Sequence, residues 1–279
     1  MTPATSVVVS TYERPDALRA VLVGLSRQHD RDFEVVVADD GSGPDTAAVV
    51  EDARNSALSD RIHHVRQEDE GFRLARARNL AVQASRGSRL VFLDGDCIPR
   101  PGFVASHRRI RPGVATCGRR ALLTESATER WLRRPEDPPA PGILGQIGMS
   151  LGGGLNRPPA FVDSPLPPLG RPLSWRRFRG MNHGIHRSDY LEVDGYDQSF
   201  TGWGFEDSDM AIRLQAAGVR LVRPGRGSTV IHLWHREADR RFEGENLVRL
   251  ESVRSSGRTR ALEGFSTLPS VTSSSTSTR

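Results

Sequence analysis

The sequence predicts an α/β protein whose core is a mostly parallel, Rossmann-like sheet flanked by helices and continuous with a second half of different character. Three observations lead to this fold class. Short β-branched runs alternate with stretches of helical apolar spacing over the first third of the chain, as in repeated strand–helix units. Several runs end abruptly in polar residues, as parallel strands do beside a ligand site. Of the 279 residues, 37% are hydrophobic and 26% charged, which suits a globular protein.

The first third of the chain contains the regular elements in order. Strands are expected at residues 6–10, 33–38, 62–65 and 90–93. Helices are expected between them, after Pro15, at residues 45–54 and at residues 74–85. Because ligands bind beyond the carboxyl ends of parallel strands, the polar residues 11–12, 39–40 and 94–96 should share one cleft.

The remainder of the chain is less regular. Residues 119–174 are dense in glycine and proline, so we expect an irregular excursion with one short helix near residues 124–132. The serine- and threonine-rich residues 266–279 are expected to be disordered. Between these two segments we expect regular structure at residues 179–185, a helix through residues 210–217 closed by Gly218, and strands at residues 220–223 and 229–231.

Charge and cysteine content narrow the class of protein. The formal net charge is +5 and all 39 basic residues are arginine, which codon bias explains. Nucleic-acid binding is not expected, because the arginine runs at residues 108–111 and 176–179 are short. Cys97 and Cys117 make neither a disulfide framework nor a zinc-ligand spacing, which favours a reducing cytoplasm. We expect no signal peptide and no transmembrane segment; peripheral association at the inner membrane face stays open.

Two carboxylates separated by one glycine follow the strand at residues 90–93. Asp94 and Asp96 repel each other unless they are solvated, paired or bound to a cation. Gly95 lets the backbone bend between them, and carboxylate oxygens suit Mg²⁺ or Mn²⁺ shared with substrate phosphates. A solvated turn at the end of a strand is the alternative interpretation.

A second acidic segment, residues 202–209, begins a helix. Trp203 lies between Gly202 and Gly204, which would expose its indole face to a sugar ring. A carboxylate beside that face could act as a general base toward a hydroxyl group. The alternative is a helix N-terminus, where acidic side chains are favoured by the helix dipole, beside a core tryptophan.

Two further features bear on ligands. His232 and His235 follow the strand at residues 229–231, and one of them could complete a metal site with the aspartates, although an isolated histidine is more often structural. The glycines at residues 41 and 43 make no dinucleotide fingerprint, because Thr46 stands where a third glycine is required, and no P-loop is present. Asp39 and Asp40 could instead accept hydrogen bonds from a base or ribose.

These pieces together resemble the family 2 glycosyltransferases, which have a GT-A fold. The resemblance is carried by VVVSTYERP (residues 7–15), VVVADDGS (35–42), EGFRLARARNLAV (70–82) and VFLDGDCIP (91–99). The second half is similar to a galactosyltransferase-type C-terminal segment over residues 180–214, GMNHGIHRSDYLEVDGYDQSFTGWGFEDSDMAIRL. The pairing of GFRLARARN with GWGFEDSD looks like the chondroitin-polymerase branch.

The resemblance implies roles for individual residues. Asp94 and Asp96 would hold Mn²⁺ or Mg²⁺, completed by His232 or His235. Asp40 would read the uracil edge, so UDP is the expected nucleotide. The implied nucleotide-sugar residues are Ser10, Thr11, Tyr12, Arg14, Asp39, Asp40, Phe72, Arg73, Arg78, Asp94 and Gly95. The implied catalytic residues are Asp207, as the base, and Glu206, and the acceptor platform is Trp203, Gly204 and Asn182.

The implied activity is transfer of a hexose or N-acetylhexosamine from a UDP-sugar to an acceptor hydroxyl, in one inverting displacement. The acceptor would be a glycan, a lipid-linked saccharide or a small molecule. A sugar nucleotidyltransferase would need a lysine-containing phosphate loop, and the chain has no lysine. A non-catalytic nucleotide-sugar or glycan-binding protein is the other alternative. The expected divisions are a nucleotide-sugar half (1–115), an acceptor wall (116–177), a catalytic half (178–240), an extension (241–265) and the tail (266–279).

Overall fold

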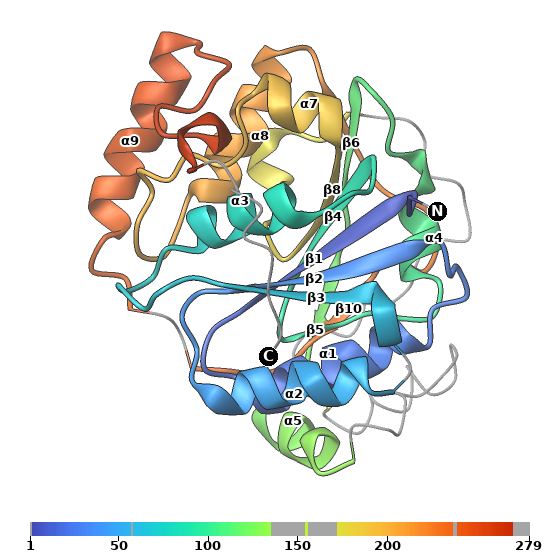
Figure 1. The fold of residues 1–279 in the computed structure, drawn as a ribbon. Coiled ribbons are helices and arrows are strands. Elements are labelled where there is room, and N and C mark those ends of the chain that lie inside the picture. The colour runs from blue at the N-terminus through green and yellow to red at the C-terminus, as the bar shows by residue number, and fades with distance from the viewer. Residues whose placement is uncertain (1, 57, 135–153, 156–171, 237–238, 270–279) are drawn as a thin grey trace.

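A seven-stranded sheet forms the centre of the protein (Figure 1). The computed structural model describes residues 2–56, 58–134, 154–155, 172–236 and 239–269. The strand order is β3-β2-β1-β4-β8-β6-β9. Its strands are β1 (Thr5–Thr11), β2 (Phe33–Asp39), β3 (Ile62–Arg66), β4 (Arg89–Asp94), β6 (Val114–Cys117), β8 (Asn182–His186) and β9 (Arg220–Val222). The strands β1 to β4 are mutually parallel, whereas β8 runs antiparallel to both β4 and β6. The mostly parallel sheet predicted from the sequence is confirmed.

Helices cover both faces of this sheet, as a parallel sheet requires. In Figure 1, α1, α2 and α5 lie below the strands, and α3, α7, α8 and α9 lie above them. The helices are α1 (Pro15–Ser26), α2 (Pro44–Arg54), α3 (Leu74–Ala84), α4 (Phe103–Ser106), α5 (Glu125–Leu132), α7 (Arg187–Glu192), α8 (Glu206–Ala216) and α9 (Glu243–Ser256). Single 3₁₀ turns occur at Ser59–Arg61, His107–Arg109, Trp175–Arg177 and Phe265–Thr267. Among the described residues, no helix combines the length and apolar character needed to cross a membrane.

The alternation of side chains along β1 produces two hydrophobic cores. Val7 and Val9 pack into the core that contains Leu18 of α1. Val8 points to the opposite face and packs into the core that contains Ala81 of α3. Successive side chains of a strand point to opposite faces, so one run of three valines supports both layers. Each fully buried valine contributes about 1.5–3 kcal/mol relative to an exposed one.

A second, three-stranded sheet lies beside the carboxyl end of β4. Its order is β5 (Cys97–Ile98), β10 (Val230–His232) and β7 (Arg120–Leu122). His232 pairs with Cys97 on one side and Leu122 on the other. The first part of the segment expected to be irregular therefore contains a strand and, at the predicted place, helix α5. Most of the remaining segment, residues 135–153 and 156–171, lies outside the described residues.

The C-terminal tail differs from the expectation over its first residues. Disorder is predicted from Ser266 onward, but Ser266 donates from its backbone nitrogen and its hydroxyl to Asp194, each at 2.8 Å. Phe265 also donates from its backbone nitrogen to the carbonyl of Asp194, at 2.7 Å. The oxygens of Asp194 therefore anchor the start of the tail, and residues 270–279 lie outside the described residues.

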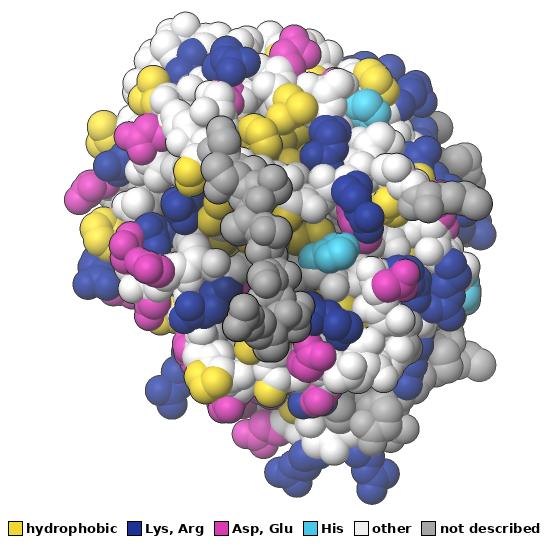
Figure 2. Space-filling model, in the orientation of Figure 1, with side chains coloured by type: hydrophobic (Ala, Val, Ile, Leu, Met, Phe, Trp, Pro, Cys, Tyr) yellow, Lys and Arg dark blue, Asp and Glu magenta, His cyan; other side chains and the backbone are white. Residues whose placement is uncertain are grey.

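The surface charge is mixed on the face that Figure 2 shows. Arginine side chains alternate there with aspartate and glutamate over the described part of the surface. Short ion pairs occur among exposed groups, such as Arg19 with Asp52 at 3.0 Å. A net charge of +5 is therefore compatible with local neutrality over this face.

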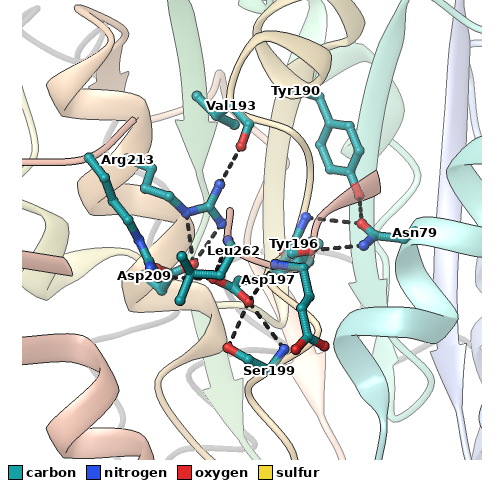
Figure 3. A network of polar contacts seen from close by, with 11 residues as sticks. Asn79, Tyr190, Val193, Tyr196, Asp197, Ser199, Asp209, Arg213 and Leu262 are labelled. Atoms are coloured by element: carbon teal, nitrogen blue, oxygen red, sulfur yellow. Dashed lines mark hydrogen bonds and ion pairs between the residues drawn. The ribbon is translucent and has the colours of Figure 1, made fainter. Parts of the chain in front are cut away.

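A buried polar network joins the helix α8 to the rest of the protein (Figure 3). The guanidinium of Arg213 donates two hydrogen bonds to Asp209, at 2.9 and 2.6 Å, and one to the carbonyl of Val193 at 2.6 Å. Asn79 of α3 donates to the carbonyl of Tyr196 at 2.8 Å and accepts from its backbone nitrogen at 2.9 Å. These contacts fix the segments on either side of residues 198–205, which lead into α8.

Candidate active site

A cleft of about 810 Å³ opens where the polar ends of β1, β2 and β4 meet the start of α8 and the end of β10. Sixteen of the residues singled out from the sequence line it. They are Ser10, Thr11, Tyr12, Arg14, Asp40, Phe72, Arg78, Asp94, Gly95, Asp96, Trp203, Gly204, Glu206, Asp207, His232 and His235. The structure thus brings together side chains from both halves of the chain.

Arg78 of α3 lies at the centre of the cleft floor, with 1% of its side chain exposed. Its guanidinium donates to Asp94 Oδ1 at 2.9 Å and to Glu206 Oε1 at 3.3 Å. Burial alone would lower the pKa of Arg78, but Tyr196 and the surrounding carboxylates raise it, so the guanidinium stays charged. One buried cation therefore links the end of β4 to the start of α8.

Gly95 explains how Asp94 and Asp96 lie so close together. Its backbone nitrogen donates to the carbonyl of Ser10 at 2.7 Å, and a Cβ here would lie 2.6 Å from that oxygen. The chain consequently turns tightly against β1. Burial raises the pKa of Asp94, the Arg78 guanidinium opposes this, and the Asp96 carboxylate adds to it. A second cation would relieve the remaining repulsion between the two aspartates.

Asp96 faces His232, the last residue of β10, and His235, which follows it. Its carboxylate lies 3.7 Å from His232 Nε2 and 3.4 Å from His235 Nε2. The backbone nitrogen of Leu233 donates to the Asp96 carbonyl at 2.9 Å, which holds the two segments together. Oxygen and imidazole ligands in this arrangement fit a divalent cation such as Mn²⁺.

His232 is the better prepared of the two histidines. Burial lowers its pKa to about 4, so the imidazole is neutral at pH 7 and able to coordinate. Its Nδ1 is buried without a hydrogen-bond partner among the described residues. The Cys97 sulfur lies within 4.8 Å of the ligand atoms of Asp96 and His232. Burial raises the pKa of that thiol well above its usual value, so it remains protonated and is a poor ligand.

Glu206 and Asp207 begin α8 after a strained turn. Phe205 immediately before them has φ 72°, a left-handed conformation uncommon for an aromatic residue. Asp207 Oδ2 accepts from the Gly180 backbone nitrogen at 2.7 Å. The other carboxylate oxygen, Oδ1, accepts from the Ser208 hydroxyl at 3.2 Å. Burial, and secondarily the Asp207 charge, raise the pKa of Glu206 to about 7. The turn therefore presents two carboxylates with different environments.

Trp203 lines the cleft with 37% of its surface exposed. The guanidinium carbon of Arg240 lies 4.6 Å from the centre of its ring. Arg240 is therefore stacked on one face of the indole through a cation–π contact, while the side chain stays partly exposed to the cleft. Gly204 has φ +110°, and no heavy atom of the described residues lies within 4 Å of the place where a Cβ would stand. Its backbone conformation, rather than a lack of space, therefore requires glycine.

Asp40 is the buried carboxylate at the end of β2. It accepts from the backbone nitrogen of Arg73 at 2.8 Å and from the side-chain amide of Gln67. Burial raises its pKa, and the Arg73 hydrogen bond partly offsets this. The neighbouring Tyr12 donates its hydroxyl to Asp69 at 3.1 Å.

Three of the predicted residues do not line the cleft. Asp39 is fully buried and bonded to the Ser42 nitrogen and His64, each at 2.8 Å. Arg73 contributes its backbone nitrogen to Asp40, while its guanidinium binds the carbonyl of Glu68 at 2.6 Å. Asn182 is buried in β8, so it does not form part of an exposed acceptor platform.

Other lining residues were not anticipated. Arg120, Arg179 and Met181 line the cleft, as do Phe205, Trp234, Arg240 and Glu243. The arginine run at residues 176–179 was the available signal, but short runs do not reveal which face they occupy. Arg120 comes from β7, in a region without a recognisable motif.

Comparison with protein families gives two matches. Residues 6–149 match the model described as glycosyl transferase family 2. Residues 162–236 match the model described as the N-terminal domain of galactosyltransferase. Together the two matches contain every residue of the cleft except Arg240 and Glu243.

Curated relatives include two kinds of enzyme. Validoxylamine A glucosyltransferase of Streptomyces hygroscopicus subsp. jinggangensis (strain 5008) is 33% identical over 241 residues, covering 79% of this chain and 53% of the relative. Chondroitin synthase of Escherichia coli is 28% identical over 226 residues, covering 76% of this chain and 32% of the relative. The chain thus spans about half the length, or less, of these two proteins.

Solved structures show the same fold at low identity. A mannosyltransferase from Pyrobaculum calidifontis, in complex with GDP-Man and Mn²⁺, has a TM-score of 0.57 at 19% identity, covering 91% of this chain and 65% of that one. GalNAc-T7 with UDP, GalNAc and Mn²⁺ has a TM-score of 0.63 at 16% identity, covering 90% and 48% respectively. These likenesses identify the architecture as a GT-A fold, as the sequence predicts.

Proposed function

The chain belongs to glycosyl transferase family 2, and we propose that it moves a sugar from a UDP-sugar to an acceptor hydroxyl in one metal-dependent, inverting displacement. The observation that carries this proposal is the meeting of two acidic groups in one cleft. Asp94 at the end of β4 and Asp96 just after it form the first group, and Glu206 and Asp207 at the start of α8 form the second; all four line the cleft, and Arg78 forms ion pairs with Asp94 and Glu206. A leaving diphosphate at the first group would lie beside an acceptor hydroxyl at the second.

The nucleotide would occupy the end of the cleft formed by β1 and β2. Tyr12, Arg14 and Asp40 line this end. Asp40 would accept from the N–H edge of uracil, because its carboxylate is held there by backbone and amide donors. GalNAc-T7 was solved with UDP, and the mannosyltransferase was solved with GDP-Man. The choice of nucleobase is therefore tested by comparing the binding of UDP and GDP directly.

Asp94, Asp96 and His232 would hold Mn²⁺ or Mg²⁺, with His235 as the competing ligand. The donor set of two carboxylates and a neutral imidazole fits these cations. The bound cation would neutralise negative charge that develops on the departing diphosphate. Arg78 contributes a fixed positive charge on the same side, since its ion pair with Asp94 holds it at the cleft floor.

Asp207 would act as the base. Its carboxylate is oriented by the Gly180 nitrogen and would accept the proton of the acceptor hydroxyl as that oxygen attacks the anomeric carbon. The bond from the anomeric carbon to the diphosphate oxygen breaks as the new glycosidic bond forms, and UDP takes the electron pair. One displacement inverts the anomeric configuration. Glu206 would bind the acceptor or donor sugar, and Trp203 would pack against a sugar face.

Calorimetry of UDP and GDP binding, with Mn²⁺, Mg²⁺ or EDTA, tests the donor site. The proposal expects metal-dependent UDP binding that Asp96→Ala abolishes. Asp52→Ala, which removes an exposed carboxylate on α2, is the matched control and should bind as wild type does. Binding that ignores both metal and Asp96→Ala would overturn the metal assignment, and preference for GDP would overturn the choice of nucleotide.

Release of UDP from a panel of UDP-sugars, offered with glycan, lipid-linked and small-molecule acceptors, tests catalysis. Asp207→Asn should keep UDP affinity and lose transfer, and the product anomer should be inverted relative to the donor. UDP-sugar affinity without UDP release in the wild type would favour a binding protein. Release of pyrophosphate from a nucleoside triphosphate and a sugar phosphate would favour a nucleotidyltransferase.

A further inference from the structure

A second hollow of about 360 Å³ adjoins the cleft and is lined mainly by arginines. We call it the arginine pocket. It shares Arg120, Leu122, Arg179 and Met181 with the cleft. Its full lining is Gly118, Arg119, Arg120, Leu122, Arg177, Arg179, Met181 and Arg223. A small molecule in the cleft could therefore extend into the arginine pocket without leaving the protein surface.

The arginine pocket gathers five guanidinium groups, of which Arg120 also acts on Asp94 of the cleft and lowers the pKa of that carboxyl. No ion pair joins any of them to a carboxylate of the described residues, in contrast to the mixed surface in Figure 2. Arg223 instead donates to the carbonyls of Cys117 and Gly118, each at 2.9 Å. Burial lowers the pKa of Arg223, and the charges of Arg119 and Arg177 lower it further. Like charges gathered in a hollow repel one another, and an anion would relieve that repulsion.

The wall of the arginine pocket is rigidly built. The buried Asn182 donates from its amide to the carbonyls of Arg119 and Ser228, at 3.1 and 2.7 Å. The backbone carbonyl of Asn182 accepts from the backbone nitrogen of Gly118 at 2.9 Å. A Cβ on Gly118 would lie 2.2 Å from the Asn182 amide, so the two residues pack directly. Asn182 thus supports the residues that present the arginines, rather than contacting ligand itself.

We propose that the arginine pocket binds an anionic group, a carboxylate or a phosphate, carried by the acceptor. The inference rests on the proposed transferase function. Arg179 immediately precedes Gly180, whose nitrogen binds Asp207, so the arginine pocket adjoins the position proposed for the acceptor hydroxyl. The cleft itself carries acidic side chains that would repel an anionic acceptor, and the arginines offset this. Guanidinium groups bind carboxylates and phosphates through paired hydrogen bonds.

The test compares sugar binding to wild type and to the double variant Arg119→Gln/Arg177→Gln. Both side chains are exposed, line only the arginine pocket and make no ion pair within the described residues. Arg109→Gln/Arg111→Gln removes the same charge from exposed positions outside both hollows and is the control. The probes are methyl glucuronide, glucose 6-phosphate and neutral methyl glucoside, titrated by NMR with and without UDP and Mn²⁺. The two charged probes distinguish a carboxylate from a phosphate.

The proposal expects at least one charged probe to bind about tenfold or more tightly than the neutral sugar, a preference that charge-assisted hydrogen bonds readily supply. Arg119→Gln/Arg177→Gln should lose that preference, while the control variant and the affinity for UDP stay unchanged. Equal binding of all three sugars would overturn the proposal. So would an equal loss of UDP affinity in the double variant, which would assign the arginines to the donor diphosphate. Failure of UDP to bind wild type counts against the proposed function alone, because the titrations without UDP still decide the inference.

Discussion

Replacing Arg78 by methionine should destabilise the protein more than loss of any exposed ion pair. Methionine keeps most of the apolar length of the side chain but removes its charge and its donors. The guanidinium is buried against Asp94, Glu206 and Ser10, at 2.9, 3.3 and 3.1 Å respectively. It also lies 5.0 Å from the ring centre of Tyr196. All of these contacts are lost together in the variant.

The expected loss follows from leaving the two carboxylates without their cation. Removing one partner of a buried ion pair typically costs about 3–5 kcal/mol of unfolding free energy. The loss should be larger at pH 8 than at pH 5. Glu206 has a pKa of about 7, so at pH 5 it is protonated in both proteins and has no unpaired charge to leave behind. At pH 8 wild-type Glu206 is ionised and paired, and the variant must either bury that charge alone or bind a proton.

Urea unfolding followed by circular dichroism, at pH 5 and pH 8 without metal, measures this difference. Arg19→Met is the matched control, because Arg19 forms an exposed ion pair with Asp52 and should change stability by less than about 1 kcal/mol. If Arg78→Met behaved like Arg19→Met at both pH values, the account of a central buried cation would be refuted. If Arg78→Met lost the same stability at both pH values, the ion pair with Asp94 would still account for the loss, but the role given to Glu206 would be wrong.

Three further predictions use the same assays. The pKa of Glu206 is about 7 in the folded protein and 4.5 in its ordinary state. The unfolding free energy of wild type should therefore fall as pH rises from 4.5 to about 7. In metal-free urea titrations, Glu206→Gln should lack this fall, which is on the order of 3 kcal/mol. If unfolding free energy depended on pH in the variant as it does in wild type, the prediction would be wrong. Gly118→Ala should destabilise by about 1–3 kcal/mol because its Cβ meets the buried Asn182 amide, whereas Gly244→Ala, with open space in α9, should not destabilise. His232→Ala should weaken metal-dependent UDP binding more than His235→Ala in calorimetry, because His232 is buried and neutral; equal effects would assign both to the metal.

The sequence predicted the elements near the proposed donor side well, because the spacing of apolar residues and the chemistry of the polar residues agree there. Three of the four predicted strands are rich in valine or leucine and form β1, β2 and β4, while the fourth, residues 62–65, forms the less buried β3; each predicted strand ends one residue before the observed one. Sites at the ends of parallel strands follow from topology alone. Residues such as Tyr12, Asp40 and Asp94 were therefore expected at one cleft from the order of the strands, and they line it.

The proposed acceptor side was harder to predict, because tertiary contacts determine which residues line it. Asn182 belongs to a motif, yet its orientation into the protein depends on pairing of β8 with β4 and β6, which no local pattern encodes. Arg119 and Arg177 are far apart in sequence and meet only in the folded chain. The stacking of Arg240 on Trp203 likewise joins two segments separated by all of α8.

The direction of β8 has a consequence for how members of such a fold could diverge. The strands β1, β2 and β4 reach the cleft with their ends, so the residues that we propose face the nucleotide follow directly on core strands. The strand β8 runs the opposite way and reaches the cleft with its beginning, so Arg179, Gly180 and Met181 arrive from the preceding loop. Insertions or deletions ahead of β8 would reshape one wall while the sheet stays unchanged. If this wall binds the acceptor, as we propose, acceptor preference would vary between related proteins without disturbing the proposed donor site.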